Sequence, residues 1–322
     1  MHFTVRNHLY NPSYITKKHN GKNMNRVRNL LDWDFVRQKG YTGDGVGVAV
    51  FDTGIFPHPD LKHRIIGMKD FVEDSYGIYD DNGHGTHVAG ILAGDGSSSE
   101  GKYTGIAPGA WLYAYKILNE GGNGNLNRAV QALEDCISRA KAYNLRILNF
   151  SMGMGKNVNS EEKKRLLNCL EMAWDAGIVV VCAAGNEGPL PMSITPPGNL
   201  RKIITVGAMD DESSNVPGNL NRGYSGRGPT GSYIMKPEVV APGTNITSCN
   251  AKRKPLYTIK SGTSMSTPVV SGAIALLLEK YPNLTPAQVK LRLYHTCVSM
   301  GLKKNHEGWG MLNLKNLLTG SL

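Results

Sequence analysis

Six short, mostly apolar runs recur along the chain and predict its strands. They are rich in β-branched residues and lie at residues 46–51, 111–117, 147–151, 178–183, 203–206 and 238–240. The runs do not alternate between apolar and polar positions, which is typical of strands covered on both faces, as in a parallel sheet.

Segments with the apolar spacing of helices separate these runs, at residues 127–143, 160–175 and 285–295. Ser160 is expected to cap the second of them, and Thr285 followed by Pro286 to begin the third. Strands that alternate with helices predict an α/β protein with a three-layer α/β/α architecture. Ligand sites in such sheets lie at the carboxyl ends of the strands.

The composition is that of a globular protein with an excess of positive charge. The 322 residues are 40% hydrophobic, which excludes an extended disordered chain. The net charge of +10 makes a nucleic acid or an acidic surface a candidate partner. Residues 1–31 hold six basic side chains and no acidic one, and without them 30 basic residues face 26 acidic ones. Such a basic arm is more often a solvated tail than a nucleic-acid reader.

We therefore expect a basic extension at residues 1–25 and a single domain at residues 26–322. The five cysteines are an odd number without a Cys-x-x-Cys pair, which argues against a disulfide framework and suits a reducing compartment. The N-terminus lacks the apolar core of a secretory signal, and no apolar run reaches the roughly 18 residues of a membrane span. The sequence predicts a cytoplasmic protein, unless the chain is a processed fragment.

Two polar residues lie where a ligand site is expected, near the carboxyl ends of the predicted strands. Asp52 ends the run at residues 46–51, although an Asp there is often a turn residue. His84 lies between two glycines ahead of a helical segment. With His87 it has the short spacing of metal ligands, but no HExxH motif and no matching ligand pair accompany it, so no metal site is expected. A general base beside a substrate cleft suits this imidazole better.

Ser264 and Asn186 carry the remaining candidate chemistry. Ser264 precedes the apolar helical segment at residues 269–281, as either a helix cap or a nucleophile that faces a cleft. Its surroundings lack the GxSxG elbow, and an acid and a histidine upstream argue against a lipase-type fold. Asn186 follows a predicted strand, where its amide marks a turn or donates to an oxyanion.

Together these motifs resemble those of the subtilisin-like serine proteases, the subtilases. The matching sequences are FDTG at Asp52, HGTHVAG at His84, AAGNEG at Asn186 and GTSMSTP at Ser264, in the order Asp, His, Ser. The resemblance covers residues 41–314 approximately. It implies a mostly parallel sheet of about seven strands and a serine endopeptidase that forms an acyl-enzyme. In that mechanism Asp52, His84 and Ser264 form the triad, and Asn186 with the Ser264 backbone N–H holds the oxyanion.

The resemblance also implies where a substrate binds. A protein or peptide would add as an extended strand between two segments of the chain. These are the edge segment Gly122, Asn123 and Gly124, which could also be a plain loop, and the facing residues Ser151, Met152, Gly153 and Gly185. Met152 suggests an apolar wall and a sizeable apolar residue before the cleaved bond.

The chain departs from secreted subtilases in two respects. Only 51 residues precede Asp52, which leaves no room for a signal peptide and a long pro-domain, so the chain resembles the intracellular branch. We hypothesise that residues 1–25 form a removable or inhibitory arm. The loop at residues 94–101 does not match the family's Asn-containing calcium loop. Catalysis needs no cofactor in this reading, and Asp95 or Glu100 could still bind a structural calcium ion.

Three alternatives differ in class from a protease. A catalytically silent subtilase fold would serve as a binding or regulatory protein, and such proteins usually lack a residue of the triad. A dinucleotide-binding enzyme is suggested by the glycines at residues 43–47, but they precede a strand rather than follow it. Nucleic-acid binding would use the basic arm and would be sensitive to salt.

Overall fold

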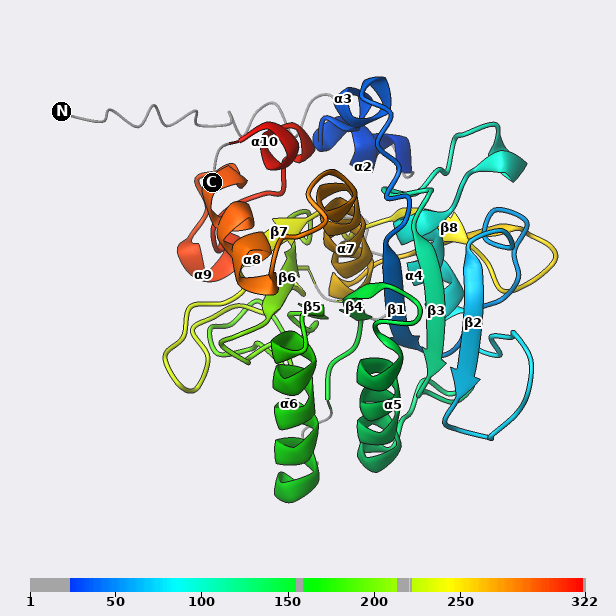
Figure 1. Ribbon diagram of the computed structural model, residues 1–322. Coiled ribbons are helices and arrows are strands. Elements are labelled where there is room, and N and C mark those ends of the chain that lie inside the picture. Colours follow the sequence, from blue (N-terminus) through cyan, green and yellow to red (C-terminus); the bar gives the residue numbers. More distant parts are fainter. Residues whose placement is uncertain (1–23, 155–158, 213–219, 221, 321–322) are drawn as a thin grey trace.

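A seven-stranded parallel sheet forms the centre of the molecule, in a computed structural model that describes residues 24–154, 159–212, 220 and 222–320 (Figure 1). The strand order is β2-β3-β1-β4-β5-β6-β7. The strands are β1 (Gly47–Asp52), β2 (Ile65–Asp70), β3 (Trp111–Lys116), β4 (Leu145–Phe150), β5 (Val179–Ala183), β6 (Ile204–Ala208) and β7 (Val239–Ala241). The expected parallel sheet of about seven strands is confirmed.

Two pairs of helices cover this sheet. Helices α4 (His84–Ala93) and α7 (Thr263–Lys280) pack against each other and against β1. Helices α5 (Leu126–Arg139) and α6 (Ser160–Asp175) pack side by side, and α6 also contacts β5 (Figure 1). Every residue of β1, β5, β6 and β7 is buried, as a strand covered on both faces requires. The three-layer α/β/α architecture is confirmed.

The remaining elements are short or peripheral. Strands β8 (Ile246–Cys249) and β9 (Tyr257–Lys260) form an antiparallel hairpin. The other helices are α2 (Met24–Leu30), α3 (Trp33–Gln38), the 3₁₀ turn η1 (Ser97–Ser99), α8 (Pro286–Thr296), α9 (Lys304–Glu307) and α10 (Leu314–Thr319). None of the helices in the described part of the chain is both long and apolar enough to cross a bilayer.

The apolar runs located six strands to within two residues at either end. They missed β2, because this edge strand is half-buried and its sequence IIGMKD mixes apolar, glycine and charged positions. The expected cap Ser160 is wrong. Asn159 caps α6 instead, since its side chain accepts hydrogen bonds from the backbone of Glu161 and Glu162, while Ser160 is already helical. Thr285 caps α8 as expected, in a capping box with Gln288.

Helix α2 begins two residues before residue 26, where the domain was expected to start. Residues 1–23 lie outside the described residues, but α2 begins at Met24, which is fully buried. Arg26 forms an ion pair with Asp210 at 2.7 Å, and the Arg28 guanidinium lies over the Trp33 ring. Two of the six positive charges that we assigned to a tail therefore belong to the folded body.

Candidate active site

Asp52 is the last residue of β1, at the carboxyl edge of the sheet, and only 1% of it is exposed. Its Oδ1 atom accepts hydrogen bonds from the backbone N–H of Thr53 at 2.8 Å and from Nδ1 of His84 at 2.7 Å. A carboxylate out of water requires such donors. The contact also fixes the proton of the imidazole on Nδ1 and leaves Nε2 as the basic nitrogen.

His84 is the first residue of α4, and its side chain is 26% exposed. Burial alone would lower the pKa of His84, but the Asp52 carboxylate favours the imidazolium more strongly, so the pKa of His84 lies above its usual value. The imidazole is therefore a base whose protonated form is stabilised by its neighbour.

The sequence around His84 explains how it reaches Asp52. Asp80 anchors the start of α4 by accepting hydrogen bonds from the backbone N–H groups of Gly83 and Thr86 and from the Thr53 hydroxyl. A Cβ atom on Gly85 would lie 2.1 Å from the carbonyl oxygen of Gly54, so only glycine permits this approach. Gly85 of HGTHVAG thus lets α4 approach the end of β1.

Ser264 is the second residue of α7, which packs against α4. Within the described part of the chain its hydroxyl has no hydrogen-bond partner and is free to turn toward an acceptor. The residue before this helix, Gly262, has a φ of 144°, which other residues rarely adopt. The helix therefore starts abruptly and presents Ser264 at its first turn.

Asn186 follows β5 and is bound to the same helix start. Its Oδ1 atom accepts hydrogen bonds from the backbone N–H of Thr263 at 3.0 Å and from the Thr263 hydroxyl at 3.1 Å. The Nδ2 group is left to donate elsewhere. A Cβ atom on Gly262 would lie 3.3 Å from Asn186 Nδ2 and 3.8 Å from the backbone nitrogen of Ser264, so both donors border the space that Gly262 leaves open. An oxyanion could accept from both there. No role of Gly262 was predicted from the sequence.

The two expected substrate segments meet at one cavity of about 240 Å³. Gly122, Asn123 and Gly124 line it on one side, and Met152 and Gly153 line it on the other. Leucine side chains and Phe150 make much of the remaining wall. The cavity is therefore wide enough for a side chain and largely apolar, as the position of Met152 suggested.

Ser151 and Gly185 do not line this cavity. Ser151 is buried, and its hydroxyl accepts a hydrogen bond from Asn149 Nδ2 at 2.8 Å. Gly185 donates its N–H to Thr263 Oγ1, and a Cβ atom there would lie 2.1 Å from Thr195 Oγ1. The side-chain positions of both residues therefore face the interior, and only their backbones remain for contact with a substrate.

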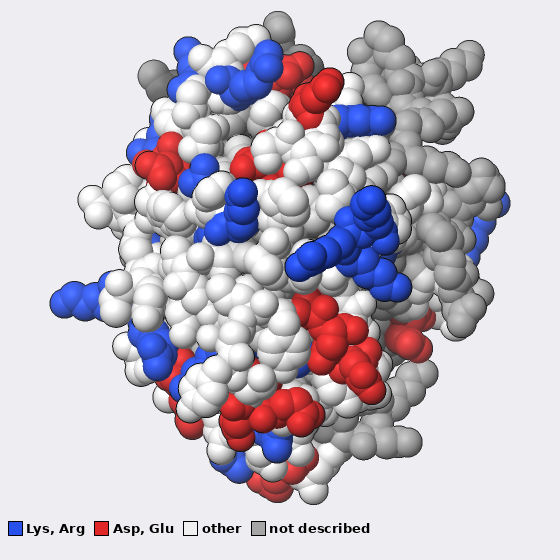
Figure 2. Space-filling model, turned by 90° about the vertical axis from the view of Figure 1, so that its right-hand side faces the viewer, with Lys and Arg blue, Asp and Glu red and all other residues white. Residues whose placement is uncertain are grey.

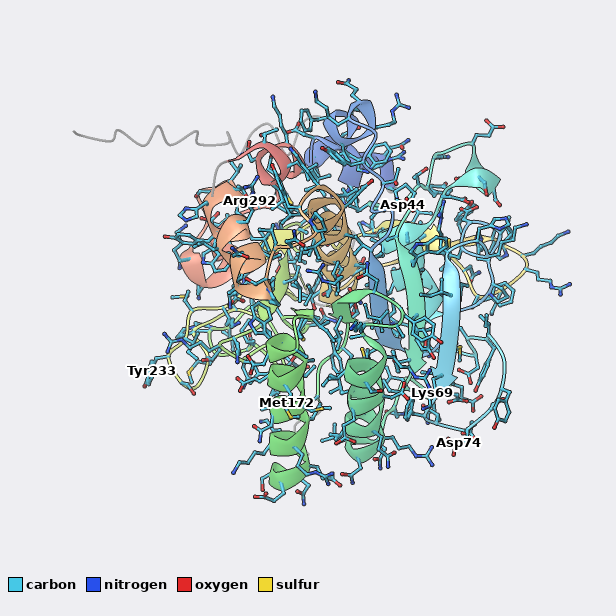
Figure 3. All side chains as sticks on the ribbon, viewed as in Figure 1. Asp44, Lys69, Asp74, Met172, Tyr233 and Arg292 are labelled. Atoms are coloured by element: carbon cyan, nitrogen blue, oxygen red, sulfur yellow. The ribbon has the colours of Figure 1, made fainter. Side chains whose placement is uncertain are left out.

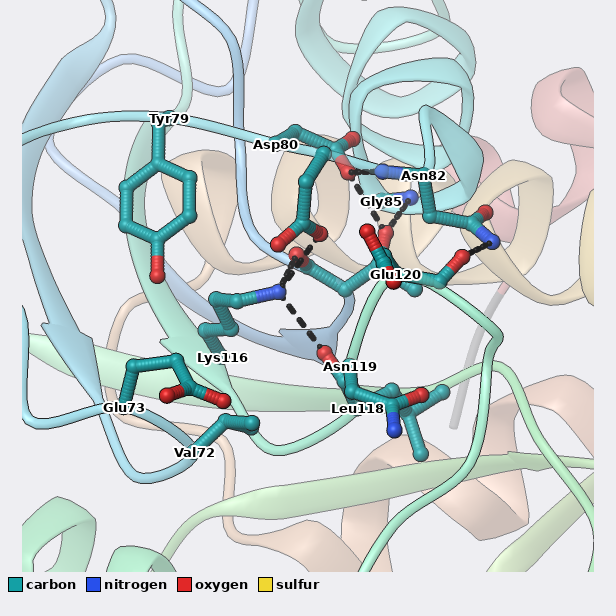
Figure 4. Close-up of polar contacts among 12 residues, drawn as sticks. Val72, Glu73, Tyr79, Asp80, Asn82, Gly85, Lys116, Leu118, Asn119 and Glu120 are labelled. Atoms are coloured by element: carbon teal, nitrogen blue, oxygen red, sulfur yellow. Dashed lines mark hydrogen bonds and ion pairs between the residues drawn. The ribbon is translucent and has the colours of Figure 1, made fainter.

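Lys116 joins three segments of the site and was not found from the sequence. Its ammonium group is fully buried at the end of β3. It donates to the carbonyl oxygens of Thr53 at 2.8 Å and Leu118 at 2.9 Å, and to Asp81 Oδ1 at 2.8 Å (Figure 4). Thr53 adjoins Asp52, Asp81 precedes His84, and Leu118 pairs with Gly124 of the edge segment. All three protons of one lysine thus fix the loops next to Asp52 and His84 to the cavity wall.

The residues suggested for calcium do not fit a calcium site. Asp95 Oδ1 accepts a hydrogen bond from the backbone N–H of Ser97, and Glu100 is exposed beyond η1. The nearby carboxylate of Asp60 is bound by the N–H of Ser98 and by the hydroxyl of Tyr257. Calcium needs six or more oxygen ligands, whereas N–H and O–H donors already bind Asp95 Oδ1 and both carboxylate oxygens of Asp60.

Another group of possible ligands comprises His58, Asp60 and Cys249, whose ligand atoms lie within 4.8 Å of one another. His58 already uses both ring nitrogens, Nε2 toward the Leu256 carbonyl and Nδ1 toward the Asp60 N–H. Neither ring nitrogen of His58 is therefore left for a metal ion.

A buried aspartate, a histidine and a serine from β1, α4 and α7, beside two N–H donors that border one space, are the set of groups that a serine hydrolase uses. A sequence profile described as "Subtilase family" matches residues 43–310. The chain therefore belongs to the subtilase family.

Named relatives agree with this assignment. Serine protease AprX of Bacillus subtilis (strain 168) is 41% identical in an alignment of length 301 that covers 87% of this chain and 67% of AprX. Subtilisin DY of Bacillus licheniformis is 35% identical over 289 residues, which cover 89% of this chain and 95% of that protein.

Solved structures are similar as well. The structure of Sphericase superposes with a TM-score of 0.72 at 31% identity and covers 85% of this chain and 92% of its own. A cold-adapted subtilisin-like serine proteinase gives a TM-score of 0.67 at 26% identity, over 85% of this chain and 88% of its own. The chain is a subtilisin-like serine endopeptidase, and a catalytically silent member of the fold is not favoured.

Replacing Lys116 tests how the site is held together. In Lys116→Met the carbonyls of Thr53 and Leu118 lose a buried donor, so the free energy of unfolding should fall by about 2–4 kcal/mol. The value of KM should rise, because the edge segment shifts. Urea unfolding in a Ser264→Ala background, which prevents self-digestion, measures the first effect, and peptide hydrolysis measures the second.

Lys69→Met on the edge strand β2 is the matched control (Figure 3). Lys69 pairs with Asp135, but its side chain is 42% exposed, so its loss should cost below about 1 kcal/mol. Equal losses in the two variants would contradict a special role for Lys116.

Proposed function

We propose that the chain cleaves peptide bonds with Ser264 as nucleophile, His84 as base and acid, and Asp52 as the residue that orients and stabilises the imidazole. The observation that carries the proposal is the 2.7 Å contact between Asp52 Oδ1 and His84 Nδ1. It leaves Nε2 to accept the hydroxyl proton, without which serine is a poor nucleophile at neutral pH.

The first half of the reaction forms an acyl-enzyme. Ser264 Oγ attacks the carbonyl carbon while its proton passes to His84 Nε2. The negative oxygen of the tetrahedral intermediate accepts hydrogen bonds from Asn186 Nδ2 and from the backbone N–H of Ser264. The carbon–nitrogen bond then breaks, and His84 gives the proton to the leaving amine.

The second half regenerates the enzyme. A water molecule gives a proton to His84 and attacks the ester carbon through the same oxyanion site. Collapse releases a carboxylic acid and returns the proton to Ser264 Oγ. These steps are complete in atoms and charge with the residues of this chain, so we propose that catalysis needs no cofactor.

Substrate binding is proposed for the cavity between the two expected segments. A protein or peptide in extended form would bind between residues 122–124 and the backbones of residues 151–153 and Gly185. The apolar wall supports a preference for an apolar residue on the N-terminal side of the cleaved bond. Contact through the main chain predicts broad tolerance elsewhere.

We propose a reducing compartment, the cytoplasm, as the place of action. The support is that all five cysteines are free, four of them buried, so the fold uses no disulfide. No feature of the described residues favours a nucleic acid over a peptide as partner.

Two substitutions test the proposed roles. Ser264→Ala should lower kcat by about 10⁶-fold, and Asn186→Ala should lower it by about 10²–10³-fold with little change in KM. In the unsubstituted protein kcat/KM should fall on the acid side as His84 takes up a proton, with an apparent pKa above the usual histidine value.

Hydrolysis of a fluorogenic peptide between pH 5 and 9 measures these effects. Ser138→Ala, on the exposed side of α5, is the control and should keep full activity. Full activity of Ser264→Ala would overturn the assignment.

We also propose that the N-terminal extension restrains activity. Its basic composition and its position ahead of the buried helix α2 support the idea. A chain that begins at Met24 should hydrolyse the peptide faster than the full chain, and a synthetic peptide of residues 1–23 should inhibit it. Unchanged activity and unchanged protein yield would exclude both inhibition and a folding role.

A further inference from the structure

The hairpin loop between β8 and β9 carries three consecutive cations, Lys252, Arg253 and Lys254, which we call the basic loop. All three are exposed. None of these side chains has a hydrogen bond, an ion pair or a ring contact within the described part of the chain. Three like charges side by side repel one another, so the folded molecule gains nothing from their proximity.

The basic loop lies beside the catalytic histidine. Ala251, the residue before it, packs against Gly83, since a Cβ atom on Gly83 would lie 3.4 Å from the Cβ of Ala251. Gly83 directly precedes His84. The loop is closed by Asn250, whose backbone N–H binds the Leu256 carbonyl and whose Nδ2 binds the Pro255 carbonyl, both at 2.8 Å.

The hairpin is also fixed to the helix that carries His84. His87 Nε2 lies 3.0 Å from the carbonyl oxygen of Ile246 in β8 and 3.2 Å from that of Thr258 in β9. Ser248 Oγ donates to the His87 carbonyl at 2.8 Å. Burial lowers the pKa of His87 to about 3, so these contacts hold at neutral pH with an uncharged ring. The basic loop therefore has a set position relative to the site.

Different segments of the chain lie on the two sides of His84. Asn82 Nδ2 donates to the carbonyl of Glu120, next to the edge segment that lines the cavity, whereas Gly83 faces the hairpin. In the proposed mechanism the N-terminal half of the substrate stays in the cavity as the acyl group. The leaving amine departs from the side where His84 delivers the proton. The basic loop thus borders the C-terminal half of the substrate.

The charges on the two sides also differ in sign. Figure 2 shows a dense group of Lys and Arg side chains and, directly below it, groups of Asp and Glu side chains. Glu73 and Glu120 lie near Lys116 on the side of the edge segment (Figure 4). An anionic group on the C-terminal half of a peptide would be attracted by the basic loop, and a cationic group would be repelled.

We propose that the basic loop selects peptides with acidic residues shortly after the cleaved bond. The inference rests on the proposed protease function and adds a substrate class to it. The interaction is between exposed charges, so it acts on encounter and on KM and weakens as salt screens it.

Three quenched fluorescent peptides test the proposal. They share one N-terminal half and carry Asp-Asp, Asn-Asn or Lys-Lys at the second and third positions after the cleaved bond, which mass spectrometry of the products verifies. At low salt kcat/KM should be about 10-fold higher for the acidic peptide than for the basic one. Near 1 M salt, where the screening length is about 3 Å, the ratio should approach one.

Two triple variants assign the effect to the loop. Lys252→Gln/Arg253→Gln/Lys254→Gln should bring the ratio toward one at low salt. The control Lys141→Gln/Lys303→Gln/Lys315→Gln removes three exposed charges elsewhere and should keep the ratio.

Equal rates for the three peptides in the unsubstituted protein, or equal loss of the ratio in both variants, would overturn the inference. Failure of the unsubstituted protein to cleave any peptide, including Asn-Asn, would instead overturn the protease function on which it rests.

Discussion

The hydrogen bond between the buried carboxylate of Asp52 and Nδ1 of His84, 2.7 Å long, is the interaction on which the site depends. Asp52 is only 1% exposed, and its negative charge is stabilised there by the two hydrogen bonds that Oδ1 accepts, from the Thr53 N–H and from His84. The contact with Asp52 sets the tautomer of His84 and raises the pKa of His84. Serine chemistry at neutral pH needs this arrangement.

Much of the fold serves to keep that contact in place. The parallel sheet brings the ends of β1 and β5 to one edge, and α4 and α7 begin beside them. Two glycines are needed because they have no side chain. Gly85 lets α4 approach β1, and Gly262 leaves room beside Asn186. Lys116 then connects the loops next to Asp52 and His84 to the wall of the cavity proposed to bind the substrate. The basic loop uses the same helix, through His87, to hold its charges beside the site.

The sequence predicted the layers and the central strands, because buried strands are continuous apolar runs and the motifs lie at their ends. It did not predict β2, whose half-exposed edge position removes that signal. The sequence also did not identify Lys116, because the three hydrogen-bond partners of Lys116 come from separate segments of the chain. The motif around Ser151 predicted contact with a substrate through the main chain. It did not reveal that the Ser151 side chain faces the interior, because a motif gives a position and not an orientation. Arg26 looked like part of a tail until its ion pair with Asp210 was seen.

Labelling with a fluorophosphonate, which reacts with an activated serine hydroxyl, tests the central claim most directly. Intact mass and peptide mapping should find one label, on Ser264, in the unsubstituted protein. Labelling should be lost or much slower in His84→Ala and in Asp52→Asn, while both variants keep the folded circular dichroism spectrum. Absence of label on Ser264 in the folded protein, or undiminished labelling in these two variants, would contradict the account.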